Sequence, residues 1–299
     1  MSKIIDWTCP FCSLHCDDLV LKKSNDGKIK RHKITCSKAL EGLKSQENLH
    51  KVSAKSIMNN REVEIGYAIH HANQILLQSH NPIVSGLGVD VAGARAIVKM
   101  AFKINAILDH KFGESLTKVT RSIQTKGLFF SSLSELKKRA DTVVIVGGDP
   151  SKKITNLQKN NFQGKEKKTI IKYGEKLKTK SELIASLQNL SASINVLNFK
   201  KDSEYNKKFL KKIINCSYIV FIWDPNFFPD DADCVADTLL EIVRNINKKR
   251  RASIIALGGD DGALTMQYTM TWMTGLPLRT AFTTRGLFHQ PEQFSLKKI

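Results

Sequence analysis

The 299-residue sequence predicts an α/β fold, with a mostly parallel sheet flanked by helices and a small N-terminal cysteine-containing hairpin unit. Two observations carry this prediction. From about residue 56 onward, short apolar and β-branched runs alternate with helical stretches of about 10 to 15 residues, which is typical of βαβ units. Before that point, four of the six cysteines fall within the first 36 residues. We therefore expect three parts, at residues 1–55, 56–155 and 156–299.

The strands are expected where an apolar run ends in turn residues. The clearest candidates are 142–147, 217–223 and 252–257, because each holds five or more apolar or β-branched residues. Weaker strands are expected at NPIVSGLG (81–88), AILDH (106–110), KTIIKYG (168–174) and INVLNFK (194–200). Helical spacing of apolar residues predicts helices between them, in the segments 62–79, 91–105, 181–189 and 234–246.

The N-terminal unit is expected to contain a β-hairpin. LVLKK (19–23) and KIKRHKI (28–34) are separated by Asn25-Asp26-Gly27, and the Asp-Gly pair tolerates the positive φ that a tight turn requires. Such a hairpin would return Cys36 towards the first three cysteines of the chain.

These cysteines form a candidate metal site. Cys9, Cys12 and Cys16 have the spacing C-x2-C-x3-C, and Cys36 follows. Four thiolates suit a [4Fe–4S] cluster, although a zinc ion or empty thiols would also account for them. We expect His15 to be a neighbour of the site rather than a ligand. In a reducing cytoplasm such a group more often binds metal than forms disulfides.

The other chemistry-bearing segments favour structural roles. GGDP (147–150) and GGDD (258–261) each follow a strand, where glycine lets backbone approach a phosphate, but neither is a known nucleotide motif. A βα turn with Asp as helix cap is the simpler interpretation. The loop DHKFGES (109–115) is a weak catalytic candidate. We predict no catalytic and no cofactor-binding residue, and we expect Cys216 and Cys234 to be small buried hydrophobic residues.

The charge balance limits the possible partners. The chain has 47 Lys and Arg against 28 Asp and Glu, a formal charge of +19, but its lysines are scattered and no aromatic residues interleave with them. We therefore expect no nucleic-acid partner. No run of about 18 apolar residues is present, so no membrane span is expected. The N-terminus is too short and polar for a secretory signal, which predicts a cytoplasmic protein.

Several segments together resemble a known family. CPFCSLHCDDL (9–19), LDHKFGESL (108–116), TVVIVGGDP (142–150) and ALGGDDGALTMQYTMTWMTGLPLRTAFTTRGLFHQPEQFS (256–295) are similar to the B subunit of formylmethanofuran dehydrogenase. They are more similar still to the B subunit of its bacterial relative, the formyltransferase/hydrolase complex of methylotrophs. The cysteine motif is shared by the wider molybdopterin oxidoreductase superfamily, whereas the segment from TGLPLRTAF to FHQPEQFS is more particular to this subunit.

The resemblance implies a [4Fe–4S] cluster and, in the archaeal enzymes, a tungsten or molybdenum bis-pterin whose metal is bound by Cys or selenocysteine in the loop matching LDHKFGESL. Here no cysteine occurs between Cys36 and Cys216, and Ser115 is a poor ligand for a soft metal. Relatives also continue beyond residue 299, so the segments that complete a bis-pterin pocket are expected to be absent or supplied in trans. We therefore expect no molybdopterin and no redox chemistry.

The resemblance also implies partners. The bacterial complex transfers a formyl group from tetrahydromethanopterin to a methanofuran-like carrier and releases formate, with hydrolysis assigned to its A subunit and transfer to its D subunit. The A, C and D subunits are thus the expected partners of a scaffold subunit, while an active dehydrogenase subunit is the alternative. The segment TWMTGLPLRTAFTTRGLFHQP (271–291) is a candidate contact surface, although its apolar side chains could equally fill the chain's own core. These side chains are Trp272, Met273, Leu276, Phe282, Leu287 and Phe288.

Overall fold

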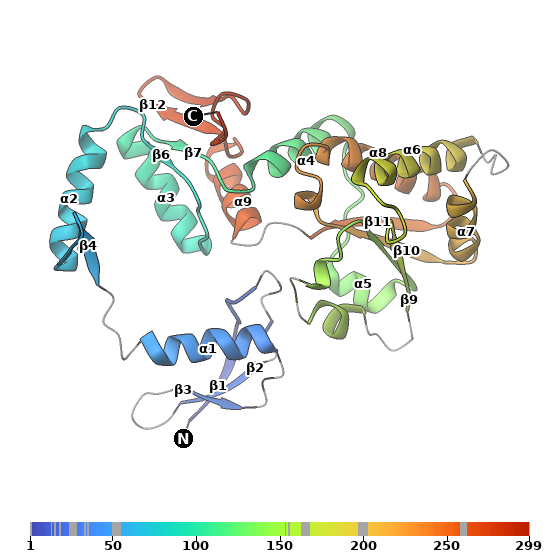
Figure 1. The fold of residues 1–299 in the computed structure, drawn as a ribbon, viewed down its shortest axis with the longest axis horizontal. Coiled ribbons are helices and arrows are strands. Elements are labelled where there is room, and N and C mark those ends of the chain that lie inside the picture. Colours follow the sequence, from blue (N-terminus) through green and yellow to red (C-terminus); the bar gives the residue numbers. More distant parts are fainter. Residues whose placement is uncertain are drawn as a thin grey trace. The chain divides into compact units, whose positions relative to one another are not determined.

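The structure is a computed structural model. It describes all residues except 1, 13, 15, 18, 24–28, 33, 35, 50–54, 153, 155, 163–167, 197–202, 258–261 and 299. The chain forms two compact units (Figure 1). Unit 1 comprises Met1–Lys111 with Asp260–Ile299, and unit 2 comprises Phe112–Gly259.

Unit 2 is built on a four-stranded parallel sheet with the strand order β11-β10-β8-β9. Its strands are β8 (Thr142–Val146), β9 (Thr169–Tyr173), β10 (Tyr218–Trp223) and β11 (Arg251–Ala256). The three most clearly expected strands are therefore confirmed. Every residue of β8 and β10 is buried, as their continuous apolar sequences require for strands covered on both faces.

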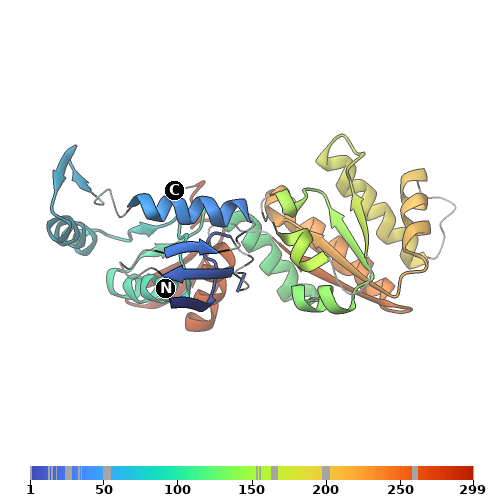
Figure 2. The same cartoon turned by 90° about the horizontal axis from the view of Figure 1, so that it is seen from below.

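Helices cover both faces of this sheet (Figures 1 and 2). On one face lie α4 (Gly113–Lys126), α6 (Lys180–Val196) and α8 (Ala232–Ile246). On the other lies α5 (Leu133–Arg139). Unit 2 also contains α7 (Glu204–Ile213) and the short turns η1 (Pro150–Lys152), η2 (Gln158–Phe162) and η4 (Pro225–Phe227).

One expected strand of unit 2 is wrong where it can be checked. The first three residues of INVLNFK are the last turn of α6, and 197–200 lie outside the described residues. The helix continues because its apolar residues keep helical spacing: Leu183, Leu187 and Leu190 are buried along one face.

Unit 1 contains a mixed sheet with the order β13-β12-β7-β6. Its strands are β6 (Ile83–Val84), β7 (Ile107–Leu108), β12 (Thr280–Thr283) and β13 (Gly286–His289). Only β6 and β7 are parallel; the other two pairs are antiparallel. Helices α3 (Val91–Ile104) and α9 (Ala263–Thr274) pack against each other. The remaining elements between 56 and 78 are β4 (Ser56–Met58), β5 (Arg61–Val63) and α2 (Ile65–Gln78).

The N-terminal part of unit 1 is a three-stranded antiparallel sheet followed by a helix. The elements are β1 (Ser2–Trp7), β2 (Leu19–Lys23), β3 (Ile29–His32) and α1 (Ser37–Leu49). The antiparallel pairing of β2 with β3 is that of the expected hairpin. Its expected turn, Asn25-Asp26-Gly27, lies outside the described residues.

The two units differ from the three expected parts. A boundary at residue 155 falls between β8 and β9, which are neighbouring strands of one sheet. Residues 260–299 return to the first unit, because β12 pairs with β7. Among the described residues, no helix combines the length and apolar character needed to cross a membrane.

Candidate functional site

The N-terminal cysteines lie around a small apolar cluster. Cys9 and Cys36 are buried together with Leu19 and Ala39, and Cys16 packs against the same cluster. The backbone N–H of Cys9 donates to the carbonyl oxygen of Cys16 at 2.8 Å, which closes the loop between them. The chain thus gathers three of the four predicted ligands in one neighbourhood.

The cysteine loop lies in contact with the first turns of α1. Cys36 directly precedes the helix, and its carbonyl oxygen accepts the N–H of Leu40 at 3.0 Å. Gly42 lies two residues after Leu40, and a Cβ at this position would overlap the ring of Phe11. Glycine is therefore required where Phe11, a residue of the loop, packs on the helix backbone.

The six cysteines, all of which belong to the described part of the chain, form no disulfide, and Cys12 is half-buried. Within the part of the chain that the structure describes, no three His, Cys, Asp or Glu side chains are arranged to hold a metal ion. His15 lies outside that part. A site made of Cys9, Cys12, Cys16 and Cys36 accordingly stays a prediction, which metal analysis can test.

The loop 109–115 is not a single cluster of polar groups, because the chain passes from unit 1 to unit 2 within it. Asp109 belongs to unit 1 and is buried. Its Oδ1 accepts the backbone N–H of His110 at 2.8 Å, and its Oδ2 accepts the backbone N–H of Leu296 at 2.9 Å. The carboxylate is thus held by backbone donors from two segments that are far apart in sequence.

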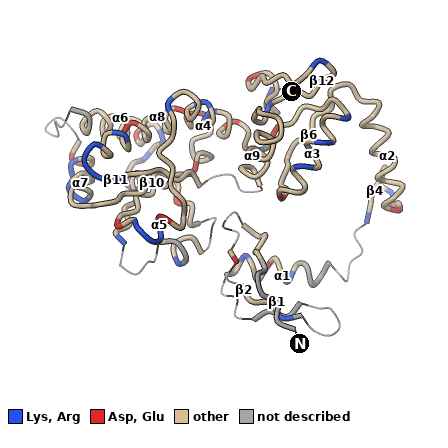
Figure 3. Tube along the Cα trace, turned by 180° about the vertical axis from the view of Figure 1, so that it is seen from behind, with Lys and Arg blue, Asp and Glu red and all other residues tan. Residues whose placement is uncertain are grey.

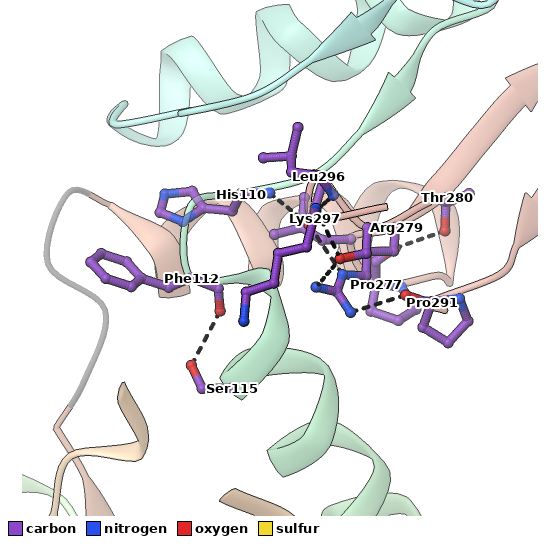
Figure 4. Close-up of polar contacts among 12 residues, drawn as sticks. His110, Phe112, Ser115, Pro277, Arg279, Thr280, Pro291, Leu296 and Lys297 are labelled. Atoms are coloured by element: carbon purple, nitrogen blue, oxygen red, sulfur yellow. Dashed lines mark hydrogen bonds and ion pairs between the residues drawn. The ribbon is translucent and has the colours of Figure 1, made fainter. Parts of the chain in front are cut away.

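Arg279 completes this arrangement (Figure 4). Its Nε donates to Asp109 Oδ1 at 3.4 Å, its Nη1 to the Pro291 carbonyl at 2.9 Å and its Nη2 to Ser295 Oγ at 3.0 Å. The strand register brings the two side chains together, because Thr280 of β12, which follows Arg279, pairs with Leu108 of β7, which precedes Asp109. Asp109 and Arg279 thus form a buried ion pair whose hydrogen bonds attach the C-terminal segment to the sheet.

Glu114 and Ser115 belong to unit 2 and also have structural partners. Glu114 Oε1 lies 3.6 Å from Lys118 Nζ, one turn along α4. The Ser115 hydroxyl donates a hydrogen bond to Asn226 Oδ1. Its oxygen also lies 3.2 Å from the Phe112 carbonyl oxygen (Figure 4). These contacts support the interpretation of the loop as a polar strand end rather than a catalytic group.

The GGDP turn after β8 is filled by aromatic side chains. A Cβ at Gly147, which has φ +73°, would lie 2.8 Å from Phe228 Cζ, and one at Gly148 would lie 2.6 Å from Phe227 Cδ2. Asp149 Oδ1 accepts the Ser151 N–H at 2.9 Å and so caps the short turn η1. Both glycines and the aspartate therefore have a structural explanation. The second turn, GGDD, lies outside the described residues.

The C-terminal candidate surface divides between core and exterior. Phe282 is fully buried in unit 1 and meets Phe102 edge-on, with ring centroids 4.7 Å apart. Trp272 and Phe288 are exposed, and the other three apolar residues of the set are half-buried. The core interpretation is therefore confirmed for Phe282, whereas contact of the exposed residues with a partner stays a prediction.

The two remaining cysteines are half-buried rather than fully buried. Cys216 Sγ accepts the hydroxyl of Thr142 at 3.0 Å, and Cys234 Sγ accepts Gln188 Nε2 at 3.3 Å. The expectation failed because both residues lie at the ends of their elements, Cys216 before β10 and Cys234 in the first turn of α8.

Comparison with known proteins agrees with the resemblance. No protein-family model matches the chain. Over 252 residues it is 23% identical to the Fhc B subunit of the formyltransferase/hydrolase complex of Methylorubrum extorquens, covering 78% of this chain and 66% of that protein. The chain thus spans just under two thirds of this relative's length.

A solved structure has the same fold. It is the crystal structure of the formyltransferase/hydrolase complex (FhcABCD) from Methylorubrum extorquens in complex with methylofuran. The TM-score is 0.70 at 20% sequence identity, and the match covers 82% of this chain and 72% of that one. The expected α/β fold class is confirmed, as is the expected similarity to the B subunit.

Proposed function

We propose that this chain is a non-redox, structural subunit of a formyltransferase/hydrolase complex, with the A, C and D subunits as its partners. The complex would transfer a formyl group from tetrahydromethanopterin to a methanofuran-like carrier and release formate. The similarity to the Fhc B subunit, which extends along most of the chain, supports this assignment. The chemistry would belong to the A and D subunits, and this chain would hold them in place.

One observation carries the non-redox part of the proposal. The loop that matches the metal-binding loop of the dehydrogenases contains Asp109, and this carboxylate is buried in contact with Arg279 and the N–H of Leu296. In the dehydrogenases that this chain resembles, the tungsten or molybdenum is bound by a Cys or selenocysteine of this loop, and here no cysteine occurs between Cys36 and Cys216. The residues present do not fit that metal centre, so we derive no redox step through it.

The four N-terminal cysteines do fit a metal by their chemistry. Thiolates of Cys9, Cys12, Cys16 and Cys36 would hold a [4Fe–4S] cluster or a zinc ion. Such a centre, when bound, would supply a covalent cross-link between the loop 9–16 and the start of α1. The burial of Cys9 and Cys36 in one apolar cluster supports this structural role. A reducing compartment such as the cytoplasm, which keeps thiols available, is part of the same proposal.

The test is to coexpress the chain with the A, C and D subunits of the same organism and to purify the assembly through a tag on this chain. The proposal expects a complex that releases formate from formyl-tetrahydromethanopterin and does not reduce an electron-accepting dye. Dye reduction that depends on the formyl carrier would contradict the non-redox role. Failure of the tagged chain to retain any of the three subunits would contradict its assignment to the complex.

A further inference from the structure

Helix α2 has the sequence pattern of a helix that packs against another surface. Its apolar residues fall at i, i+3, i+4, i+7, i+10 and i+11, which places them in one stripe along the helix. We call this set the α2 stripe: Ile65, Ala68, Ile69, Ala72, Ile75 and Leu76. The rest of the helix surface carries histidine, asparagine and glutamine side chains, together with Tyr67 and Leu77.

The stripe is not covered by the described part of the chain. None of the 14 residues of α2 is buried, and Ile65, Ile69 and Ile75 are 58%, 61% and 54% exposed. A stripe of this width normally faces a core, since burying each isoleucine contributes about 1.5–3 kcal/mol. Isolated exposed apolar residues need no explanation, but a periodic stripe indicates a contact surface.

Helix α2 also lacks charged side chains, which indicates what kind of surface it can contact. α2 contains no Lys, Arg, Asp or Glu (Figure 3), although these four residue types make up 25% of the chain. Depletion of charge is typical of the central part of a protein interface. It argues against an anionic membrane surface, because helices that lie on such membranes carry Lys and Arg on their polar face.

The net charge of the chain distinguishes between a second copy and a different protein. Each copy carries a formal charge of +19, so two copies brought together would repel each other. A different protein of opposite net charge would be attracted to the chain as a whole, and charge complementarity raises association rates and suppresses wrong partners.

We infer that the α2 stripe is the surface by which this chain docks a neighbouring subunit of opposite net charge, which receives the helix in an apolar groove. The inference rests on the proposed function, because it identifies the partner as one of the A, C and D subunits. Helix-in-groove docking of this kind depends on anchors at i, i+4 and i+7 spacing, which Ile65, Ile69 and Ala72 provide.

The stripe and the opposite side of the helix supply a matched pair of variants. Ile69→Glu places a charge in the stripe, and Leu77→Glu places the same charge outside it, where the side chain is 71% exposed. Both introduce a good helix former. The full-length chain is expressed alone and purified through its tag, and its affinity for each separately purified subunit is measured.

Ile69→Glu is expected to weaken binding to one of these subunits by about ten-fold or more, the scale of one buried isoleucine, while Leu77→Glu leaves binding within about two-fold of the wild type. Equal binding by both variants would overturn the docking surface but leave the proposed function standing. If the wild-type chain bound none of the three subunits, the proposed function would fail as well. An Ile69→Glu chain that does not fold, by circular dichroism, would instead show that the stripe packs within this chain.

Two further outcomes would also overturn the inference. One is concentration-dependent dimerisation of the isolated wild-type chain in analytical ultracentrifugation, abolished by Ile69→Glu. The other is cosedimentation with vesicles of equal parts phosphatidylcholine and phosphatidylserine, lost in Ile69→Glu but kept in Leu77→Glu. The inference expects a monomer that does not bind such vesicles through α2.

Discussion

Arg279 and Asp109 form an ion pair between residues 170 positions apart in the sequence, with side chains that are 3% and 1% exposed. The pair lies where β12 begins beside the end of β7. Arg279 also adopts a positive φ of 66°, a conformation that costs a non-glycine residue of order 1 kcal/mol. The hydrogen bonds from this arginine to Pro291 and Ser295 offset that cost.

Asp109→Ala is expected to lower the free energy of unfolding by about 3–5 kcal/mol, because it leaves the Arg279 guanidinium buried without its counter-charge. Chemical denaturation of the wild type and the variant measures the difference. The matched control is Glu62→Ala, since the Lys55–Glu62 pair is shorter, at 2.6 Å, but both side chains are 58% exposed. Removing that surface pair should cost about 0–1 kcal/mol. Similar losses in the two variants would show that burial does not decide the strength of the pair.

Gly147 and Gly127 both have positive φ, at +73° and +80°, but a Cβ would have open space only at Gly127. Gly127→Ala is therefore expected to cost about 1–3 kcal/mol for the backbone conformation alone, because φ 80° with ψ −168° is a combination that essentially only glycine adopts. Gly147→Ala should cost about 1–3 kcal/mol more, because the added methyl group displaces the rings of Phe227 and Phe228. Urea denaturation of both variants tests this. A loss at Gly147 no larger than at Gly127 would mean that the aromatic rings do not constrain the turn.

The exposed and buried aromatic residues of segment 271–291 should respond differently to truncation. Phe282→Ala is expected to destabilise the chain by about 3–5 kcal/mol, because its buried ring packs on Phe102. Trp272→Ala should change stability by less than about 0.5 kcal/mol, because its side chain is 62% exposed. Thermal and chemical unfolding of the isolated chain distinguish the two. A large loss in Trp272→Ala would place this residue in the chain's own core.

The strands of unit 2 could be predicted because their signal is local. TVVIV and YIVFIW are apolar at almost every position, as fully buried parallel strands require. Strands β12 and β13 gave a weaker signal and were not expected, although Thr283 and Gly286 mark the turn between them, with Thr283 Oγ1 donating to the Gly286 carbonyl at 2.8 Å. Four-residue strands joined by a polar turn fall below what an alternation pattern resolves.

The sequence predicts neither the contact between Asp109 and Arg279 nor the exposure of the α2 stripe. Nothing near DHKFGES or LPLRTAF indicates that Asp109 meets Arg279, because the contact depends on the register of two strands that pair across most of the chain. The helical periodicity of α2 was visible in the sequence, but it predicts a buried face. Only the structure shows that the described part of this chain leaves the face exposed.

The Tyr205 hydroxyl should make stability fall in alkaline solution. Burial raises the pKa of Tyr205 above its usual value of about 10, and nearby Glu175 raises it further, although a hydrogen bond from the Gly174 N–H partly lowers it. The folded state thus holds the proton more tightly than the unfolded state. Its contribution to stability is complete below the unfolded pKa and is lost as pH rises through the folded pKa.

Tyr205→Phe should therefore reduce the fall in unfolding free energy above about pH 10. Denaturation series at increasing pH, with ultraviolet absorbance reporting phenolate, give the comparison. A variant with the same alkaline dependence as the wild type would assign the effect to another group.

The content of the four-cysteine site can be decided by metal analysis of the anaerobically purified complex. A [4Fe–4S] cluster predicts about four iron atoms per chain, and a structural zinc predicts about one zinc. Because these ligands would join the loop 9–16 to the start of α1, removing the metal with a chelator should lower the unfolding temperature of the N-terminal part. Cys9→Ser and Cys36→Ser should lose the metal and show the same decrease.

Cys216→Ser is the control, since this half-buried cysteine also lacks a disulfide but belongs to unit 2. This variant should retain the wild-type metal content. A wild-type complex without iron or zinc, or Cys9→Ser and Cys36→Ser chains that keep their metal, would show that these cysteines serve only as packing residues of the apolar cluster.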